Sequence, residues 1–281
     1  MNRLAILSAT LCVLVLNCFL MVDAQGANVR SECDPNVGLG SFRGCQIEFD
    51  GPIERGDAAK VSRLLVQDLG SAHFWSGISL NSPGGDVEEA FKIALLVKAA
   101  AIWTDAAESP EAYFNAIRRE GGRTVHFYTC ASACFIVMVA GSERRPRIGK
   151  GEGRIGIHRP FFDASFYRTS SIAEIQSRQT LAMERMRSFL AAEGVSTRLI
   201  DEMMIRPSTD VHWLALDEYE REVGFQSPWW EELTNATCPA IPKDPPDPRD
   251  IGAAANARWA CIEKLRRSAQ ADLRKKLAAT K

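Results

Sequence analysis

The stretch that decides how this chain of 281 residues folds is NSPGG at Asn81–Gly85. It follows ISL at 78–80, a short apolar run typical of a strand, and it precedes a helical pattern that begins at Asp86. Two consecutive glycines allow the backbone to approach a ligand closely and to present its N–H groups. Those groups lie near a helix N-terminus, which favours developing negative charge. The stretch therefore predicts a functional turn, with a purely structural tight turn as the alternative.

Strand and helix patterns alternate on both sides of this turn. The predicted strands cover 46–49, 78–80, 125–128 and 154–158, and the predicted helices cover 57–69, 86–95, 130–140, 171–193 and 196–205. This order predicts an α/β domain with a largely parallel sheet.

Ser132 is the candidate nucleophile. It lies in CASAC at Cys130–Cys134, after a predicted strand and at the start of a helix of small and apolar residues. A hydroxyl there points out of the sheet edge into the helix dipole, as a nucleophile should. The N–H of Ala133 would lie beside the oxyanion that forms when the hydroxyl attacks a carbonyl group. An ordinary N-cap serine is the structural alternative.

His158 is the candidate base. It ends an apolar strand in GIHRP at Gly156–Pro160, and an imidazole is the natural base for a serine at neutral pH. A histidine in this setting is also a common core residue. The other histidines fit less well, because His126 alternates with apolar residues inside a strand and His73 and His212 lie in loop-like stretches.

Together and in this order, these motifs resemble the proteolytic subunit of the Clp protease and, more broadly, the Clp/crotonase superfamily. Asn81–Gly85 matches that family's Asn-Ser-Pro-Gly-Gly motif, and GPI at 51–53 is similar to its Gly-x-Ile turn. Ser132 falls at the nucleophile position, and Ala-Gly at 140–141 matches the end of the nucleophile helix. IGIHRP at 155–160 resembles the strand that ends in the catalytic histidine.

The resemblance covers about residues 46–226 and points in particular to exported ClpP-like bacterial proteins with a Cys-x-Ser-x-Cys motif. It implies an α/β fold of the Clp/crotonase type, a superhelix of repeated ββα units, here followed by a C-terminal helical appendage. It also implies a serine peptidase whose oxyanion hole contains the N–H groups of Gly84, Gly85 and Ala133. Peptides or proteins are the implied substrates, and no cofactor or metal is implied.

The third catalytic residue of the family is an aspartate that precedes an aromatic residue, a helix and a glycine. Asp210 precedes Trp213 and Gly224, with a register off by about one residue, and is the best match. Asp217 and Asp201 are poorer matches. One carboxylate on the far nitrogen of the imidazole is enough to orient it.

The chain departs from the Clp subunit in several segments. The stretch between Gly85 and Ser132 is longer than in the Clp subunit by about the length of residues 102–119. We interpret this segment as an insertion that acts as a lid or replaces the contacts by which Clp subunits form rings. The helix expected at about 251–278 is interpreted as a solvated, amphipathic tail. We therefore divide the chain into a signal peptide at 1–24, an N-terminal segment at 25–45, a catalytic domain at 46–226, and a Pro-rich loop with a C-terminal helix at 227–281.

Residues 1–24 are typical of a secretory signal peptide. Arg3 precedes an apolar run at 4–22, and Val-Asp-Ala at 22–24 forms a small-x-small cleavage site. A periplasmic or secreted protein is therefore expected. The alternative is an uncleaved anchor at 4–22, which would keep the protein near a membrane.

Six of the eight cysteines follow the predicted signal peptide, and an even number in an exported chain favours disulfides. The spacing suggests two local pairs, Cys33 with Cys45 and Cys238 with Cys261. Cys130 and Cys134 are one helical turn apart, which is poor disulfide geometry, so buried thiols are at least as good an interpretation. Zinc is not expected, because no two pairs share metal-site spacing with a nearby histidine.

The net charge of −1 indicates neither a nucleic-acid surface nor a polybasic membrane patch. The sequence is compatible with a homo-oligomer. Export argues against a ring of the Clp type, which works with a cytosolic unfoldase. Three alternatives to the peptidase also stay open. The first is a catalytically inactive peptide-binding or scaffold protein, and the second is a Ser/Lys hydrolase of the signal-peptide-peptidase type that uses Lys150. Crotonase-like acyl-CoA chemistry is third, and export disfavours it.

Overall fold

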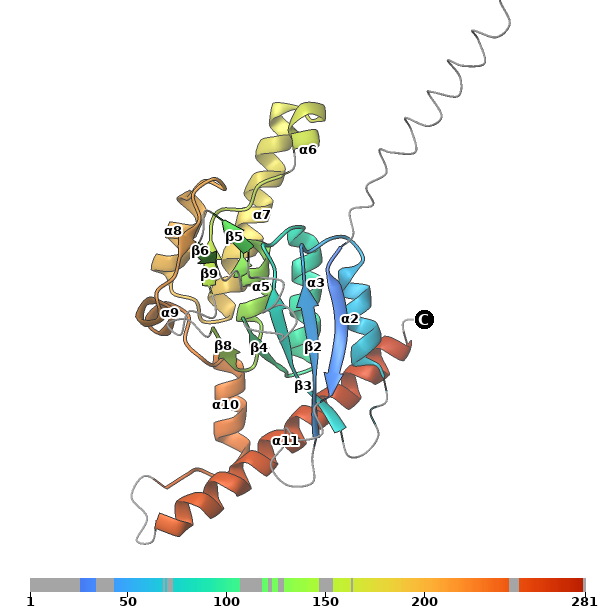
Figure 1. Cartoon of the computed structure of the whole chain (residues 1–281), viewed down its shortest axis with the longest axis vertical. Helices are drawn as coiled ribbons and strands as arrows, with labels where there is room; N and C mark the ends of the chain where they lie inside the picture. The colour runs from blue at the N-terminus through green and yellow to red at the C-terminus, as the bar shows by residue number, and fades with distance from the viewer. Residues whose placement is uncertain are drawn as a thin grey trace, which may run out of the picture.

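The structure, a computed structural model, describes residues 26–33, 43–67, 69, 73–106, 118–120, 123–125, 129–146, 154–162, 164–242 and 248–279. The predicted signal peptide, His126 and Lys150 lie outside these residues. The described chain is a mixed α/β protein (Figure 1).

A five-stranded sheet lies at the centre, in the order β1-β2-β3-β4-β8. Its strands are β1 (Asn28–Cys33), β2 (Arg43–Asp50), β3 (His73–Asn81), β4 (Trp103–Asp105) and β8 (Arg144–Arg145). The pairs from β2 to β8 are parallel, as the alternation of strands and helices predicts, and β1 is antiparallel to β2.

Two strands of this sheet differ from the expectations. The sequence of β1 has no clear period and was not predicted as a strand, yet it pairs with β2 along its whole length. β4 lies within the range interpreted as an insertion, but its residues are buried and paired with β3. A lid would therefore have to be confined to later residues, of which 107–117 lie outside the description.

A second sheet has the order β10-β9-β7 and carries the candidate catalytic residues at its strand ends. It contains β7 (Thr129–Ala131), β9 (Arg154–Ile157) and β10 (His212–Trp213). β7 and β9 are parallel, whereas β10 is antiparallel to β9. A bridge between Ser82 and Cys130 joins it to the end of β3. A separate hairpin pairs β5 (Arg118–Glu120) with β6 (Arg123–Val125).

The helices pack around the two sheets (Figure 1). They are α2 (Asp57–Leu65), α3 (Val87–Ala99), α5 (Ala133–Val139), α6 (Ala164–Thr169), α7 (Ile172–Ala192), α8 (Thr197–Ile205), α9 (Leu216–Glu222), α10 (Pro228–Thr237) and α11 (Pro248–Ala279). Every residue of α5 is buried, so this short helix forms the centre of the core. The side chain of Asp86 accepts the Glu89 N–H and caps α3.

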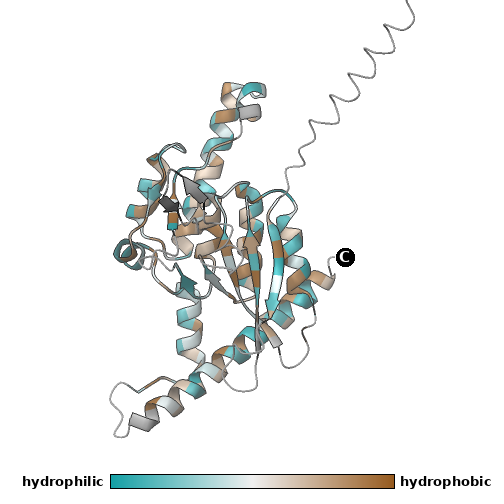
Figure 2. Cartoon of the chain, in the orientation of Figure 1, coloured by the Kyte–Doolittle hydropathy of each residue, from teal (hydrophilic) through white to brown (hydrophobic). Residues whose placement is uncertain are grey.

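The expectation that the C-terminal helix is a solvated tail was wrong. Arg266 and Gln270 of α11 are 1% and 2% exposed. Gln270 Oε1 accepts the Trp75 N–H at 3.1 Å, and its Nε2 donates to the Trp75 carbonyl at 2.7 Å. Arg266 Nε donates to the Ala101 carbonyl at 3.1 Å. Figure 2 shows a mixed hydropathy along α11. Its contacts with Trp75 and Ala101 come from polar side chains, so an apolar pattern did not predict that this face is buried.

The structure pairs all six cysteines beyond the predicted signal peptide. Cys33–Cys45 and Cys238–Cys261 form as the spacing predicts. Cys130 and Cys134 are also joined, so their interpretation as thiols was wrong. These bonds fit an oxidising environment. Within the described ranges, no helix is both long and apolar enough to cross a membrane.

Candidate active site

Asn81 and Ser82 connect the main sheet to the strand that precedes Ser132. Asn81 Nδ2 donates to Asp50 Oδ1 at 2.7 Å, and its Oδ1 accepts the Thr129 N–H at 3.2 Å. The Ser82 N–H donates to the Thr129 carbonyl at 2.6 Å, and the Ser82 carbonyl accepts the Ala131 N–H at 3.0 Å. These bonds fix the start of the glycine turn relative to the end of β7.

The glycines of this turn have φ angles of 99° at Gly84 and 142° at Gly85, which other residues rarely adopt. Space excludes side chains as well. A Cβ on Gly84 would lie 2.6 Å from Ser132 Cβ, and one on Gly85 would lie 2.1 Å from the Ile53 carbonyl oxygen. Gly84 therefore allows the turn to contact the candidate nucleophile directly.

Ser132 has an unusual backbone, with φ 56° and ψ −124°. A non-glycine residue held in such a region costs about 1–3 kcal/mol, and such residues concentrate at functional sites. Its N–H donates to the Gly156 carbonyl, and its carbonyl accepts the Phe135 N–H, each at 3.0 Å. Its side chain makes no capping hydrogen bond, unlike that of an ordinary N-cap serine.

The conformation of Ser132 also corrects the predicted helix at 130–140. Cys130 and Ala131 belong to β7, and α5 begins only at Ala133. Ser132 is therefore the corner between a strand and a helix. In this position its side chain projects away from the buried helix.

His158 follows directly after β9 and is 6% exposed. Its Nδ1 lies 2.8 Å from the Arg159 carbonyl oxygen. Because a carbonyl oxygen can only accept, the neutral imidazole in this contact carries its proton on Nδ1, and Nε2 is the nitrogen that can accept a proton. The Arg159 N–H donates to the Arg206 carbonyl at 3.0 Å, which holds this segment against the end of α8.

One cavity of about 930 Å³ brings Ser132, His158 and Gly85 together. Apolar residues form much of its wall, and its charged lining residues are three acidic ones and one arginine. The lining residues are Pro52, Ile53, Glu54, Arg55, Pro83, Gly85, Asp86, Val87, Glu88, Ser132, His158, Pro160, Phe161, Phe162, Gln179, Ala182, Ser208 and Val211.

Two backbone N–H groups beside Ser132 are free to bind a ligand. Within the described chain, neither the Gly85 nor the Ala133 N–H has a hydrogen-bond acceptor. Both groups are adjacent to a helix N-terminus, where the dipole favours negative charge. The Gly84 N–H differs, because it donates to Ser82 Oγ at 3.2 Å.

Asp210, the predicted third residue, makes a different contact. Its Oδ2 pairs with Arg206 at 2.9 Å, and its side chain is 61% exposed. Asp201 pairs with Arg187, and Asp217 is exposed on α9. No hydrogen bond joins any of these carboxylates to His158 in the described structure, nor does one join Ser132 Oγ to His158.

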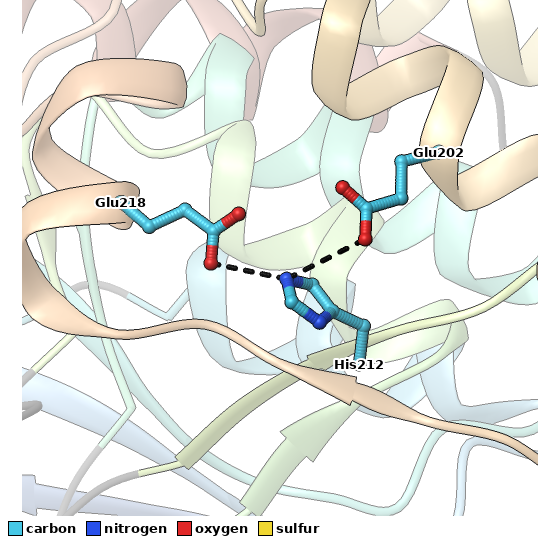
Figure 3. A group of neighbouring side chains, drawn as sticks. All are labelled: Glu202, His212 and Glu218. Atoms are coloured by element: carbon cyan, nitrogen blue, oxygen red, sulfur yellow. Dashed lines mark hydrogen bonds and ion pairs between the residues drawn. The ribbon is translucent and has the colours of Figure 1, made fainter.

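A second polar cluster, not predicted from the sequence, lies around His212 of β10, with Glu202 from α8 and Glu218 from α9 (Figure 3). His212 Nε2 lies 3.0 Å from Glu218 Oε2 and 3.8 Å from Glu202 Oε1. Three such groups can hold a metal ion. Here, however, Arg206 already binds Glu202 at 2.7 Å, and Arg198 binds Glu218 at 3.3 Å. We interpret the cluster as an ion-pair network that holds α8, β10 and α9 together.

Only one contact of this cluster can be predicted from the sequence. Glu202 and Arg206 have the i,i+4 spacing of a helical ion pair. Nothing in the sequence places Glu218 beside them, because it belongs to a different helix. The proximity therefore depends on the pairing of β10 with β9.

No model of a known protein family matches the chain. No curated protein sequence matches it either. Among solved structures, it is similar to ClpP1 from Listeria monocytogenes, with 19% identity over 64% of this chain and 88% of that one, at a TM-score of 0.40. A point mutant of the same protein gives the same identity and coverage, at a TM-score of 0.42.

Proposed function

We propose that this protein is a serine hydrolase that cleaves peptide bonds, with Ser132 as nucleophile and His158 as general base. The observation that carries this proposal is the placement of Ser132. It occupies a positive-φ corner at the start of α5, in the same cavity as His158 and beside two N–H groups without acceptors. Nucleophile, base and oxyanion donors are the parts that acyl transfer requires.

The proposed reaction follows from these positions. Ser132 Oγ attacks the carbonyl carbon of the substrate, and His158 Nε2 accepts the hydroxyl proton. The N–H groups of Gly85 and Ala133 bind the oxyanion, with Gly84 in a supporting position. The intermediate then expels the amine, which takes the proton from His158, and water hydrolyses the acyl-enzyme with the same base.

Ser132 and His158 must approach each other for this step. Catalytic hydrogen bonds are often long in unliganded enzymes and shorten when substrate binds. The Arg159 carbonyl already holds the His158 ring in the tautomer that a base requires. Asp210 as third catalytic residue remains a prediction, and a Ser–His pair oriented by this carbonyl is the simpler arrangement.

Two features support a peptide as substrate. The cavity has apolar walls that include Val87, Pro160 and Phe161, which suit an apolar side chain. Three acidic residues line it, Glu54, Asp86 and Glu88, against one arginine, Arg55, and this balance does not favour the phosphates of an acyl-CoA. Export by residues 1–24, residence in the periplasm or outside the cell, and the four-part division of the chain remain predictions, and a homo-oligomer stays open.

The test uses a fluorophosphonate probe, whose phosphorus is attacked by an activated serine with loss of fluoride. We expect the wild-type protein to be labelled at Ser132 and the Ser132→Ala variant to remain unlabelled. Ser208→Ala is the matched control, because Ser208 lines the same cavity. His158→Ala should label at least about 100-fold more slowly. Undiminished labelling of Ser132→Ala would refute the assignment.

A non-catalytic peptide-binding module is the second candidate. The observation that favours it is that Asp210 is paired with Arg206, while no hydrogen bond joins His158 to Ser132 in the described structure. A broad peptide library distinguishes the two functions. Wild-type protein that binds peptides as tightly as Ser132→Ala, and cleaves none of them, would favour the binding module.

A further inference from the structure

The disulfide between Cys130 and Cys134 encloses the proposed nucleophile. Cys130 lies on β7, Cys134 lies in the first turn of α5, and Ser132 is the middle one of the three residues between them. Both cysteines are completely buried, whereas Ser132 lines the cavity. The bond therefore lies on the core side of the corner and joins the two elements that form it.

This bond opposes both ways in which the corner could relax. If Ser132 became helical, Cys130 would join α5 as a regular i,i+4 pair, whose Cβ atoms lie about 5–6 Å apart, further than the roughly 3.5–4.5 Å of a disulfide. If it became extended, the two Cα atoms would separate to about 13 Å, whereas they are 5.1 Å apart. The covalent link is compatible with the strand–corner–helix arrangement that the structure shows.

The same corner sets the positions of the reacting groups. It directs the side chain of Ser132 into the cavity and places the Ala133 N–H beside it. Gly84 contacts the corner from the cavity side, where a Cβ would lie 2.9 Å from the Ala133 nitrogen. The rest of the cavity wall comes from other segments. Relaxation of the corner would therefore affect the reaction of Ser132 more than the binding of a ligand.

We infer that the Cys130–Cys134 disulfide is a positioning element of the active site, and that its reduction switches the hydrolase off. This inference rests on the proposed function. Because both cysteines are buried, a dithiol reaches the bond when the corner opens transiently. It then reduces the bond by thiol–disulfide exchange: it supplies two electrons and two protons, becomes a cyclic disulfide, and leaves two cysteine thiols. The enzyme is thus active in an oxidising compartment and inactive in a reducing one.

The first test is the double variant Cys130→Ala/Cys134→Ala, with Cys238→Ala/Cys261→Ala as the matched control. Both lose one disulfide, but only the first pair flanks Ser132. Fluorophosphonate labelling kinetics separate the maximal rate from the half-saturating probe concentration. We expect the first variant to lose about 10- to 100-fold in maximal rate, with unchanged half-saturation. The control should label like the wild type, and circular dichroism should show both variants folded.

The second test changes no residue at the corner. A variant that keeps only the Cys130–Cys134 bond has the other four cysteines beyond the predicted signal peptide replaced by alanine. It is labelled before reduction, after dithiothreitol, and after reoxidation. We expect labelling to fall and then recover, while the residual rate of Cys130→Ala/Cys134→Ala does not respond to dithiothreitol.

The outcomes distinguish this inference from the proposed function. If the oxidised wild type is not labelled at Ser132, the proposed function fails and the inference fails with it. Only the inference is overturned if the oxidised wild type is labelled and keeps its labelling rate after dithiothreitol, while mass spectrometry shows that Cys130 and Cys134 have become thiols. Equal maximal rates in the two double variants would also overturn it.

Discussion

At Ser132 the backbone distinguishes this serine from the many serines that begin helices. Ser171 and Ser196 each accept a helical N–H with the side chain, from extended backbone. Ser132 makes no such bond and has a positive φ. The sequence can place a serine at a helix start, but only contacts with Gly156 and Gly84 reveal its conformation.

Gly84→Ala tests how closely the glycine turn packs against Ser132. We expect it to lower the free energy of unfolding by about 3 kcal/mol or more, because strain at positive φ and a clash with Ser132 combine. Gly56→Ala is the control, since φ is 102° there and no atom lies within 4 Å of an added Cβ. It should cost about 1 kcal/mol. Urea denaturation measures both, and equal losses would contradict the proposed packing.

Asp210→Asn separates the two views of the third catalytic residue. The structure shows an exposed ion pair between Asp210 and Arg206, and no hydrogen bond joins Asp210 to His158 among the described residues. We therefore expect a change of less than about tenfold in the rate of fluorophosphonate labelling. A fall of about 10,000-fold, the effect expected when an aspartate orients the base, would show that Asp210 reaches His158 in the reacting enzyme.

At the scale of elements, the sequence predicts long capped helices better than short strands. α7 and α8 begin and end within one or two residues of the predicted ranges, because Ser171 and Ser196 cap them. The strands β1, β7 and β10 lack a readable period. Each is held mainly by its neighbours, β1 by β2 and both β7 and β10 by β9. Their position is a tertiary property.

β1 also creates an unusual carboxyl group in β2. Burial raises the pKa of Glu48 to about 7, and a hydrogen bond that protonated Glu48 donates to Glu32 adds to the rise, while Arg30 opposes it. Between about pH 4.5 and 7 the folded state then holds a proton that the unfolded state has released. The contribution of Glu48 to the free energy of unfolding is therefore fully present below pH 4.5, and it is lost as the pH rises to about 7.

Glu48→Gln should remove this dependence, because its amide does not titrate. We expect a smaller decline in the midpoint of thermal unfolding between pH 4.5 and 7 than in the wild type. Glu174→Gln, at an exposed helical position, is the control and should keep the wild-type slope. Identical slopes for wild type and Glu48→Gln would show that Glu48 does not titrate in this range.

At the scale of the whole molecule, α11 joins the end of the chain to its first strands. Gln270 satisfies both backbone groups of Trp75, which is 195 residues away in sequence. Figure 1 shows α11 crossing beneath the central sheet from the side of α10 to that of α2. The helix is therefore part of the folded domain that carries the site.

Gln270→Ala tests this role. It leaves the N–H of buried Trp75 without a partner, so we expect a loss of about 1–3 kcal/mol in the free energy of unfolding. Lys275→Ala, at a position with an 81% exposed side chain on the same helix, should have almost no effect. A single cooperative transition that shifts only in Gln270→Ala would confirm that α11 folds with the sheet.

The sequence by itself determined the alternation of strands and helices, the glycine turn, and the two residues that we propose as nucleophile and base. These depend on local patterns: apolar periodicity, capping residues and glycines at fixed distances. Only the tertiary structure decided the positive φ of Ser132, the Cys130–Cys134 bond and the burial of one face of α11. Each arises from contacts between segments distant in sequence or from a backbone corner that no local pattern encodes.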